Sequence, residues 1–153
     1  MSVAVILHVL SVVIWVGGMF FAYMCLRPVA AGLLEPPLRL RLWVGVFERF
    51  FPWVWSSVAL ILATGLWITF AWFQGFGSSP LYVHIMFGLG LVMMLIFMHV
   101  FFAPYRRLRR AVAAEDWPDG AKALGQIRIL VGTNTLIGLL TVAVASGGRY
   151  LVP

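Results

Sequence analysis

Four long apolar runs without a single Asp, Glu, Lys or Arg constrain this chain more than any other feature of its sequence. Each run is close to the roughly 20 residues that an α-helix needs to cross about 30 Å of hydrocarbon. A soluble domain of 153 residues could not bury so much apolar surface, since 63% of the chain is hydrophobic and only 10% is charged. We therefore expect an all-α integral membrane protein, one domain over residues 1–153, folded as a four-helix transmembrane bundle with helices at about 3–26, 53–73, 81–103 and 129–147.

The positions of Arg and Lys predict the orientation of these helices. The connections after the first and third runs hold ten of the eleven basic residues, and residues 74–80 hold none. Because basic connections remain in the cytoplasm, we expect both termini outside, in the periplasm. This pattern explains the net charge of +6 without nucleic acid as a partner. The lipid bilayer is the expected partner, and a homodimer or a larger membrane complex stays open.

The connections themselves carry helical patterns. Residues Pro37–Phe51 mix large apolar side chains with arginines, which fits either an amphipathic helix in the inner interface or an extension of the second span, kinked at Pro52. Residues Arg106–Arg128 hold acids as well as bases and predict a short solvated helix. The segment Gly75–Pro80 predicts a tight turn between antiparallel helices two and three.

All three histidines, His8, His84 and His99, fall within the apolar runs, where polar side chains are costly and usually functional. In this topology His8 and His84 lie within roughly 3 Å of the same depth near the outer face. His99 lies roughly 22 Å further toward the cytoplasm. Asn134, flanked by two threonines, lies near the depth of His99 and predicts a second polar cluster.

Two apposed histidines on neighbouring helices are typical of b-type haem ligation, so His8 and His84 are candidate axial ligands between helices one and three. Arg149 near the outer face is a candidate partner for the haem propionates. The same histidines fit a metal site or plain interhelical hydrogen bonds. Met94 and Met98, one turn apart beside His99, suit Cu(I), although methionine is also ordinary packing material.

Three stretches resemble the CopD family of membrane proteins, named for copper resistance. They are His8-Val-Leu-Ser-Val-Val-Ile-Trp15-Val-Gly17-Gly18-Met19-Phe20, Tyr82-Val-His84 with the later His99, and Ile127–Thr141. The resemblance implies copper handling, often described as uptake from the periplasm, and a place in the bacterial inner membrane.

A more distant likeness is to the HemJ-type protoporphyrinogen oxidases, small helical membrane proteins that bind haem b. Their first-helix histidine matches His8, but their third-helix His-x-Lys pattern reads His84-Ile85-Met86 here. This likeness implies haem, puts Met86 forward as a rival axial ligand, and leaves open a haem-dependent oxidoreductase.

These observations give three hypotheses. The first is a haem b protein that takes part in membrane electron transfer, with haem as the cofactor. The second is copper binding or uptake. The third is a non-catalytic helical subunit of a respiratory complex. No hydrolase, metalloprotease or phosphate-loop motif occurs in the sequence.

Overall fold

The computed structural model describes the backbone of residues 2–151 and the side chains of residues 3–148 and of Tyr150. In this part of the chain every regular element is a helix. The elements, in chain order, are α1 (Ser2–Phe21), a π-helical turn η1 (Ala22–Leu26), α2 (Arg27–Leu33), α3 (Pro36–Phe73), a 3₁₀ turn η2 (Phe76–Ser78), α4 (Leu81–Phe102), α5 (Pro104–Ala113) and α6 (Trp117–Leu151).

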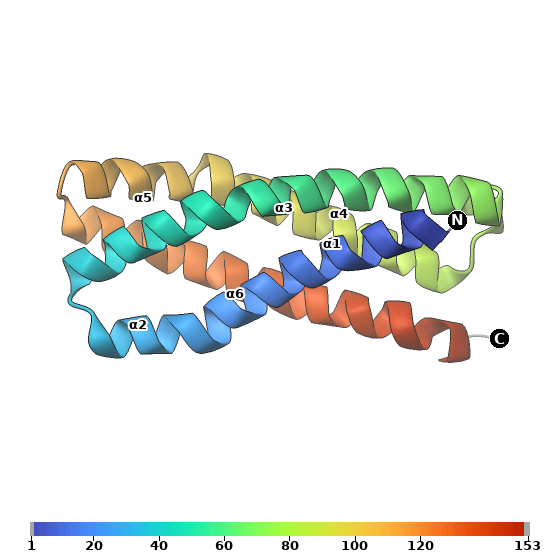
Figure 1. The fold of residues 1–153 in the computed structure, drawn as a ribbon, viewed down its shortest axis with the longest axis horizontal. Coiled ribbons are helices and arrows are strands. Elements are labelled where there is room, and N and C mark those ends of the chain that lie inside the picture. The colour runs from blue at the N-terminus through green and yellow to red at the C-terminus, as the bar shows by residue number, and fades with distance from the viewer. Residues whose placement is uncertain (1, 152–153) are drawn as a thin grey trace.

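The helices form four long antiparallel rods (Figure 1). Three helical segments, α1, η1 and α2, follow one another in the first rod; α3 is the second, α4 and α5 the third, and α6 the fourth. Both termini and the turn around η2 lie at one end of the bundle, as expected, and the other two connections lie at the opposite end. We call that opposite end the basic end, because ten of the eleven Arg and Lys residues lie in the two segments of the chain that follow the first and third apolar runs and connect the rods there.

The segment 37–51 is an extension of the second span, one of the two alternatives that the sequence left open. It begins at Pro36 and continues past Pro52 without a break in α3. With 38 residues, α3 is about 57 Å long, far more than the hydrocarbon core of a bilayer requires. The helix therefore reaches well beyond the membrane at the basic end.

The third and fourth helices are also longer than the spans predicted for them. After α4, the chain bends at Ala103 and continues as α5, which starts with Pro104 in its first turn. The short helix expected within 106–128 is divided between two helices. Its first part lies in α5, and its last part lies in α6, which begins at Trp117 and runs directly into the fourth span. The helix α5 is amphipathic. Its apolar face packs on the bundle and its polar face carries arginines, which fits a position at the boundary with water.

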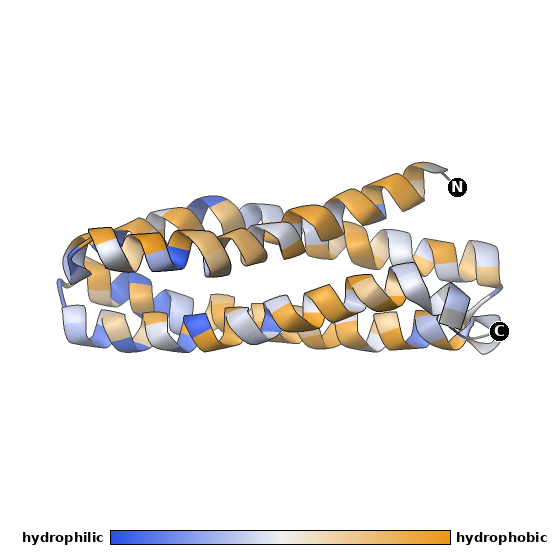
Figure 2. Cartoon of the chain, turned by 90° about the horizontal axis from the view of Figure 1, so that it is seen from below, coloured by the Kyte–Doolittle hydropathy of each residue, from blue (hydrophilic) through white to orange (hydrophobic). Residues whose placement is uncertain are grey.

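Lipid is the solvent that this surface requires. All four rods are long and apolar enough to cross a membrane, so the chain is a multi-pass membrane protein. Large aliphatic or aromatic side chains stay exposed on each rod, among them Val13, Phe70, Leu95 and Leu136, each about 60% exposed. Figure 2 shows hydrophobic residues along most of the bundle and hydrophilic ones gathered toward the basic end.

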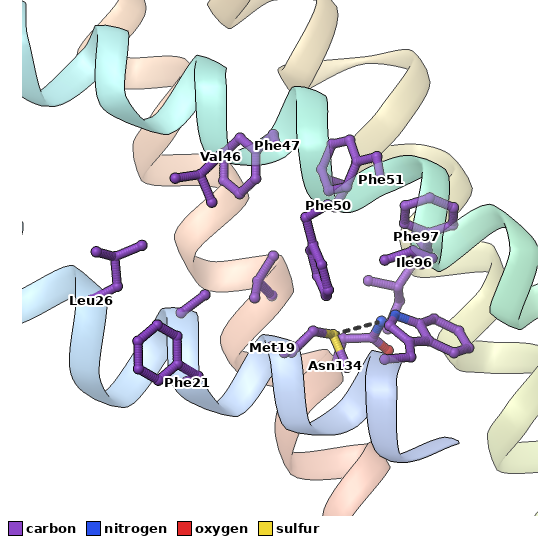
Figure 3. Close-up of a pocket in the computed structure, with 16 residues that line it drawn as sticks. Met19, Phe21, Leu26, Val46, Phe47, Phe50, Phe51, Ile96, Phe97 and Asn134 are labelled. Carbon is purple, nitrogen blue, oxygen red and sulfur yellow. Dashed lines mark hydrogen bonds between the residues drawn. The ribbon is translucent and has the colours of Figure 1, made fainter. Parts of the chain in front are cut away.

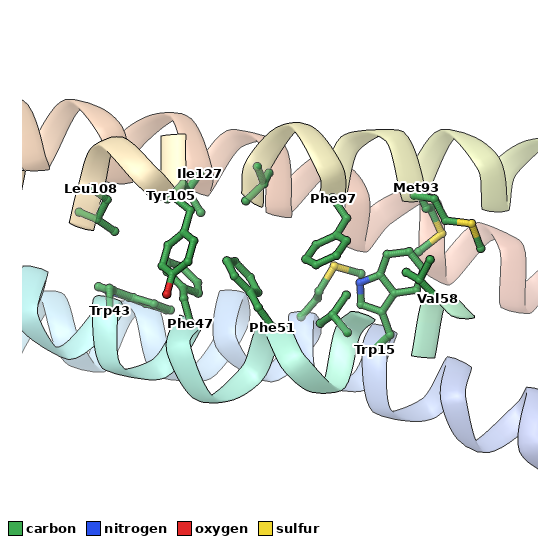
Figure 4. Packing of buried hydrophobic residues seen from close by; sticks show 14 of the residues in the cluster. Trp15, Trp43, Phe47, Phe51, Val58, Met93, Phe97, Tyr105, Leu108 and Ile127 are labelled. Carbon is green, nitrogen blue, oxygen red and sulfur yellow. The ribbon is translucent and has the colours of Figure 1, made fainter. Parts of the chain in front are cut away.

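Aromatic rings fill the core between α3 and the α4–α5 rod (Figure 4). Phe47 stacks on Phe51 with ring centroids 5.0 Å apart, and Phe51 meets Tyr105 edge-on at 4.8 Å. Phe97 joins this column to Trp15 of α1, 6.1 Å away. The rings of this column therefore join α1, α3 and the α4–α5 rod in one core.

Candidate functional site

His8 of α1 faces α3, where its Nδ1 lies 2.9 Å from the hydroxyl oxygen of Thr64. That hydroxyl donates its only hydrogen to backbone carbonyl oxygens of its own helix, chiefly that of Leu60. Thr64 must then accept from His8, so Nδ1 of the imidazole carries the proton. The opposite nitrogen, Nε2, keeps a free lone pair, which is the arrangement that metal-binding histidines use.

Gly65 makes room for this imidazole. A Cβ atom at this position would lie 3.3 Å from Cε1 of His8, closer than most side-chain contacts. Thr64 and Gly65 therefore form a small seat for the ring on α3. Neither residue stood out in the sequence, because a threonine and a glycine in an apolar helix are common packing residues.

The other residues predicted for haem lie against different neighbours. His84 is exposed, and its Nδ1 lies 3.2 Å from the carbonyl oxygen of Pro80 in the same rod. Its ring contacts Phe76, with centroids 6.0 Å apart. Met86 is half-buried. Within the described side chains no hydrogen bond or ring contact joins His8 to His84, and the side chain of Arg149 lies outside the described part of the chain.

The predicted copper ligands of α4 are divided between the core and the lipid surface. Met94 is buried, Met98 is half-buried and His99 is exposed. Among the described side chains no hydrogen bond joins His99 to Asn134. The polar contact of Asn134 with α4 is instead made six residues before His99, at Met93.

Asn134 of α6 is the centre of this buried cluster. It is the only asparagine of the chain and is 2% exposed. Its Nδ2 donates to the carbonyl oxygen of Met93 at 3.2 Å and lies 3.7 Å from Sδ of Met19 on α1. Thr141 of α6 in turn approaches Sδ of Met93 at 4.0 Å. The amide of Asn134 thus meets one thioether, that of Met19, and one backbone carbonyl, that of Met93, from two other rods.

The amide oxygen of Asn134 is left without a partner. Among the described side chains it is the one buried polar atom with no hydrogen bond. An unpaired buried acceptor costs about 1–3 kcal/mol, so such atoms are rare unless something binds them. Asn134 also lines a cavity of about 300 Å³.

That cavity opens between α1, α3, α4 and α6 (Figure 3). Its wall is almost entirely apolar, and Figure 3 shows Met19 and Asn134 together on one side of it, with Phe50 pointing in from α3. Gly18 permits this position of Phe50, since a Cβ atom there would overlap the ring. The Trp15 indole lines the same space. Met19, Trp15 and Asn134 therefore border one largely apolar cavity.

Clusters of His, Cys, Asp and Glu side chains are a second kind of metal site. In the described residues no three His, Cys, Asp or Glu side chains come together in a way that could hold a metal ion. Cys25, the one cysteine, is exposed. The donors that do meet in the core are the soft sulfur of methionine and neutral groups.

A model of the protein family described as Copper resistance protein D matches residues 44–147. The match covers 104 of the 153 residues and takes in three of the four rods, including Met93, Met94 and Asn134. No curated protein and no solved structure matches the chain.

Proposed function

This chain belongs to the copper resistance protein D (CopD) family, and on that premise we propose that it binds copper inside its helical bundle as part of copper uptake across the membrane. The family resemblance predicted from the sequence is thereby confirmed. Membership of this family supports copper, the second of the three hypotheses, over haem.

The observation that carries the proposal is the side chain of Asn134 at the cavity wall, whose Nδ2 lies 3.7 Å from the thioether sulfur of Met19 and whose amide oxygen is unpaired. Thioethers are soft ligands that select Cu(I) over harder cations. A bound Cu(I) ion would give the amide oxygen of Asn134 the positively charged partner that it lacks. The face of the Trp15 indole would add cation–π attraction in a site shielded from water. Met93 would approach as a further sulfur donor after a change of side-chain rotamer.

Met94, Met98 and His99 extend the proposal along α4 toward the basic end. Met94 and Met98 are one turn apart and provide two more thioethers, and His99 beside Met98 provides an imidazole. We assign them as secondary positions for copper on its way along the bundle, and Met19, Met93 and Asn134 as the principal site.

Haem stays a prediction from the sequence. Its support is the free Nε2 that the Thr64 contact leaves on His8, together with the expected common depth of His8 and His84. A reduced-minus-oxidised optical spectrum of protein made with ample haem tests it. A sharp α band that disappears in His8→Ala would establish haem ligation, and a flat spectrum would remove the haem and electron-transfer hypothesis.

The copper proposal is tested by titrating the detergent-purified protein with Cu(I) against a coloured chelator. We expect one tight site in the wild type. Met19→Leu conserves volume and should cost little stability, yet weaken Cu(I) by about tenfold or more. Met24→Leu is the matched control, because Met24 is on the same rod and is exposed. Equal Cu(I) affinity in wild type, Met19→Leu and Met24→Leu would overturn the proposed site.

A further inference from the structure

A second pocket, of about 250 Å³, lies at the basic end and has a different character from the cavity beside Asn134. Arg27 of α2, Arg39 of α3 and Arg128 of α6 all line it. We infer that this pocket binds the phosphate group of an anionic phospholipid. The inference does not depend on copper binding.

The geometry of Arg27 suits an anion. Its guanidinium lies over the ring of Tyr23, 4.5 Å from the centroid, and its Nε donates to the carbonyl oxygen of Tyr23 at 3.2 Å. These two contacts fix the side chain and leave both terminal nitrogens without a further partner among the described residues. Tyr23 itself is held against α6 at Gly132, where a Cβ atom would lie only 2.7 Å from its ring.

The π-helical turn η1 is what directs these two side chains. A π turn adds a residue to the helical repeat and so changes which face the following side chains occupy. Here it lies between α1 and α2, immediately before Arg27. Such turns are frequent at functional sites, and this one brings Tyr23 and Arg27 onto the pocket.

Among the described residues no carboxylate pairs with the three arginines of this pocket. None of the described residues that line it is acidic. The ion pair found among the described side chains joins Arg41 to Glu115 at 3.1 Å, and both residues lie outside the pocket lining. Three arginines from three elements without a carboxylate repel a cation, so this pocket is unsuited to copper. They attract a phosphate, for which the arginine fork is well shaped.

The rest of the lining is apolar and favours a lipid over a free anion. Trp43, Phe47, Leu124 and Val131 form the wall beyond the arginines. Phe47 and Val131 also line the cavity beside Asn134, so this wall continues toward the membrane interior. A ligand with a phosphate at one end and hydrocarbon at the other matches both parts. The orientation predicted from the arginines places the pocket in the cytoplasmic leaflet, where anionic lipids attract basic pockets between helices.

Native mass spectrometry of the full chain in detergent tests this inference, with phosphatidylglycerol and phosphatidylcholine as probes. We expect retention of phosphatidylglycerol over phosphatidylcholine by the wild type. Arg39→Gln combined with Arg128→Gln should weaken phosphatidylglycerol binding by about thirty-fold, from about tenfold per 1.4 kcal/mol and roughly 1 kcal/mol per arginine. The control, Arg106→Gln with Arg109→Gln, removes the same charge near the same end from exposed positions outside the pocket and should retain the lipid.

Three results would overturn the inference. Equal loss in the control pair would show diffuse attraction to the basic end. Equal retention of both lipids would remove the role of the net negative charge of the headgroup, since phosphatidylcholine also carries a phosphate. Displacement of phosphatidylglycerol by millimolar inorganic phosphate would assign the pocket to a free anion. Thermal unfolding of each variant without added lipid shows whether it is folded, and Arg39→Gln alone provides a milder variant for the same comparison.

Discussion

Replacing Asn134 by Leu separates a binding role from a structural one. The two side chains have the same branched shape, so the packing around the site is largely retained. The change removes the unpaired Oδ1, which removes a penalty of about 1–3 kcal/mol, and also removes the Nδ2 bond to Met93, which contributes about 0.5–1.5 kcal/mol. The carbonyl oxygen of Met93 lies within α4 and retains its helical partner, so it is not left unpaired.

We therefore expect the stability of copper-free Asn134→Leu to lie between about 0.5 kcal/mol below and about 2.5 kcal/mol above that of the wild type. Cu(I) affinity should nevertheless fall by about tenfold or more, since a ligand atom is lost. Unfolding in mixed detergent micelles measures the first quantity, and Cu(I) competition measures the second.

Thr135→Val is the matched control for this experiment. Thr135 is the next residue on α6, is also buried, and donates only to the carbonyl oxygen of Val131 on its own helix. Its replacement should leave Cu(I) affinity unchanged. The reasoning is refuted if Asn134→Leu destabilises the copper-free protein by more than about 2 kcal/mol while its Cu(I) affinity stays at the wild-type value.

Three further substitutions test the structure around the site. Leu108→Ala removes a fully buried side chain of α5 and should cost about 2–5 kcal/mol of stability in detergent unfolding; a cost below 1 kcal/mol would contradict the packing. Glu115→Gln breaks a largely exposed pair with Arg41 and should change stability by less than about 1 kcal/mol in the same assay. Thr64→Val removes the acceptor of His8 Nδ1–H, so nitrogen-15 NMR should show a changed tautomer balance for His8, and an unchanged ring spectrum would refute the assigned proton position.

Much of the fold could be predicted because the membrane imposes strong rules on sequence. Charge-free runs of the right length predicted the four rods, and the Gly75–Pro80 segment predicted the turn. The continuation of α3 through Pro52 was one of two predicted alternatives. The long ends beyond the membrane were harder to predict, because the charged, solvated segments at the basic end carry weaker signals than the spans.

The inner faces of the helices could not be predicted, and the reason is physical. In a soluble bundle the polar face marks the outside, but here lipid and core are equally apolar. Leu95 is 61% exposed and its neighbour Met94 is 5% exposed, yet both are apolar residues. The prediction therefore placed Asn134 near His99 by depth. In the structure the carbonyl oxygen of Met93 is the group of α4 that bonds to Asn134, and His99 lies at the surface. An asparagine that is unique in the chain and lies within a span was the available signal for this site.

The most direct test of the copper site is the copper K-edge X-ray absorption spectrum of the Cu(I)-loaded protein. The proposed site predicts sulfur scatterers at about 2.3 Å in the wild type, fewer of them in Met19→Leu, and an unchanged spectrum in Met24→Leu. A first shell of nitrogen and oxygen alone, the same in all three proteins, would contradict it.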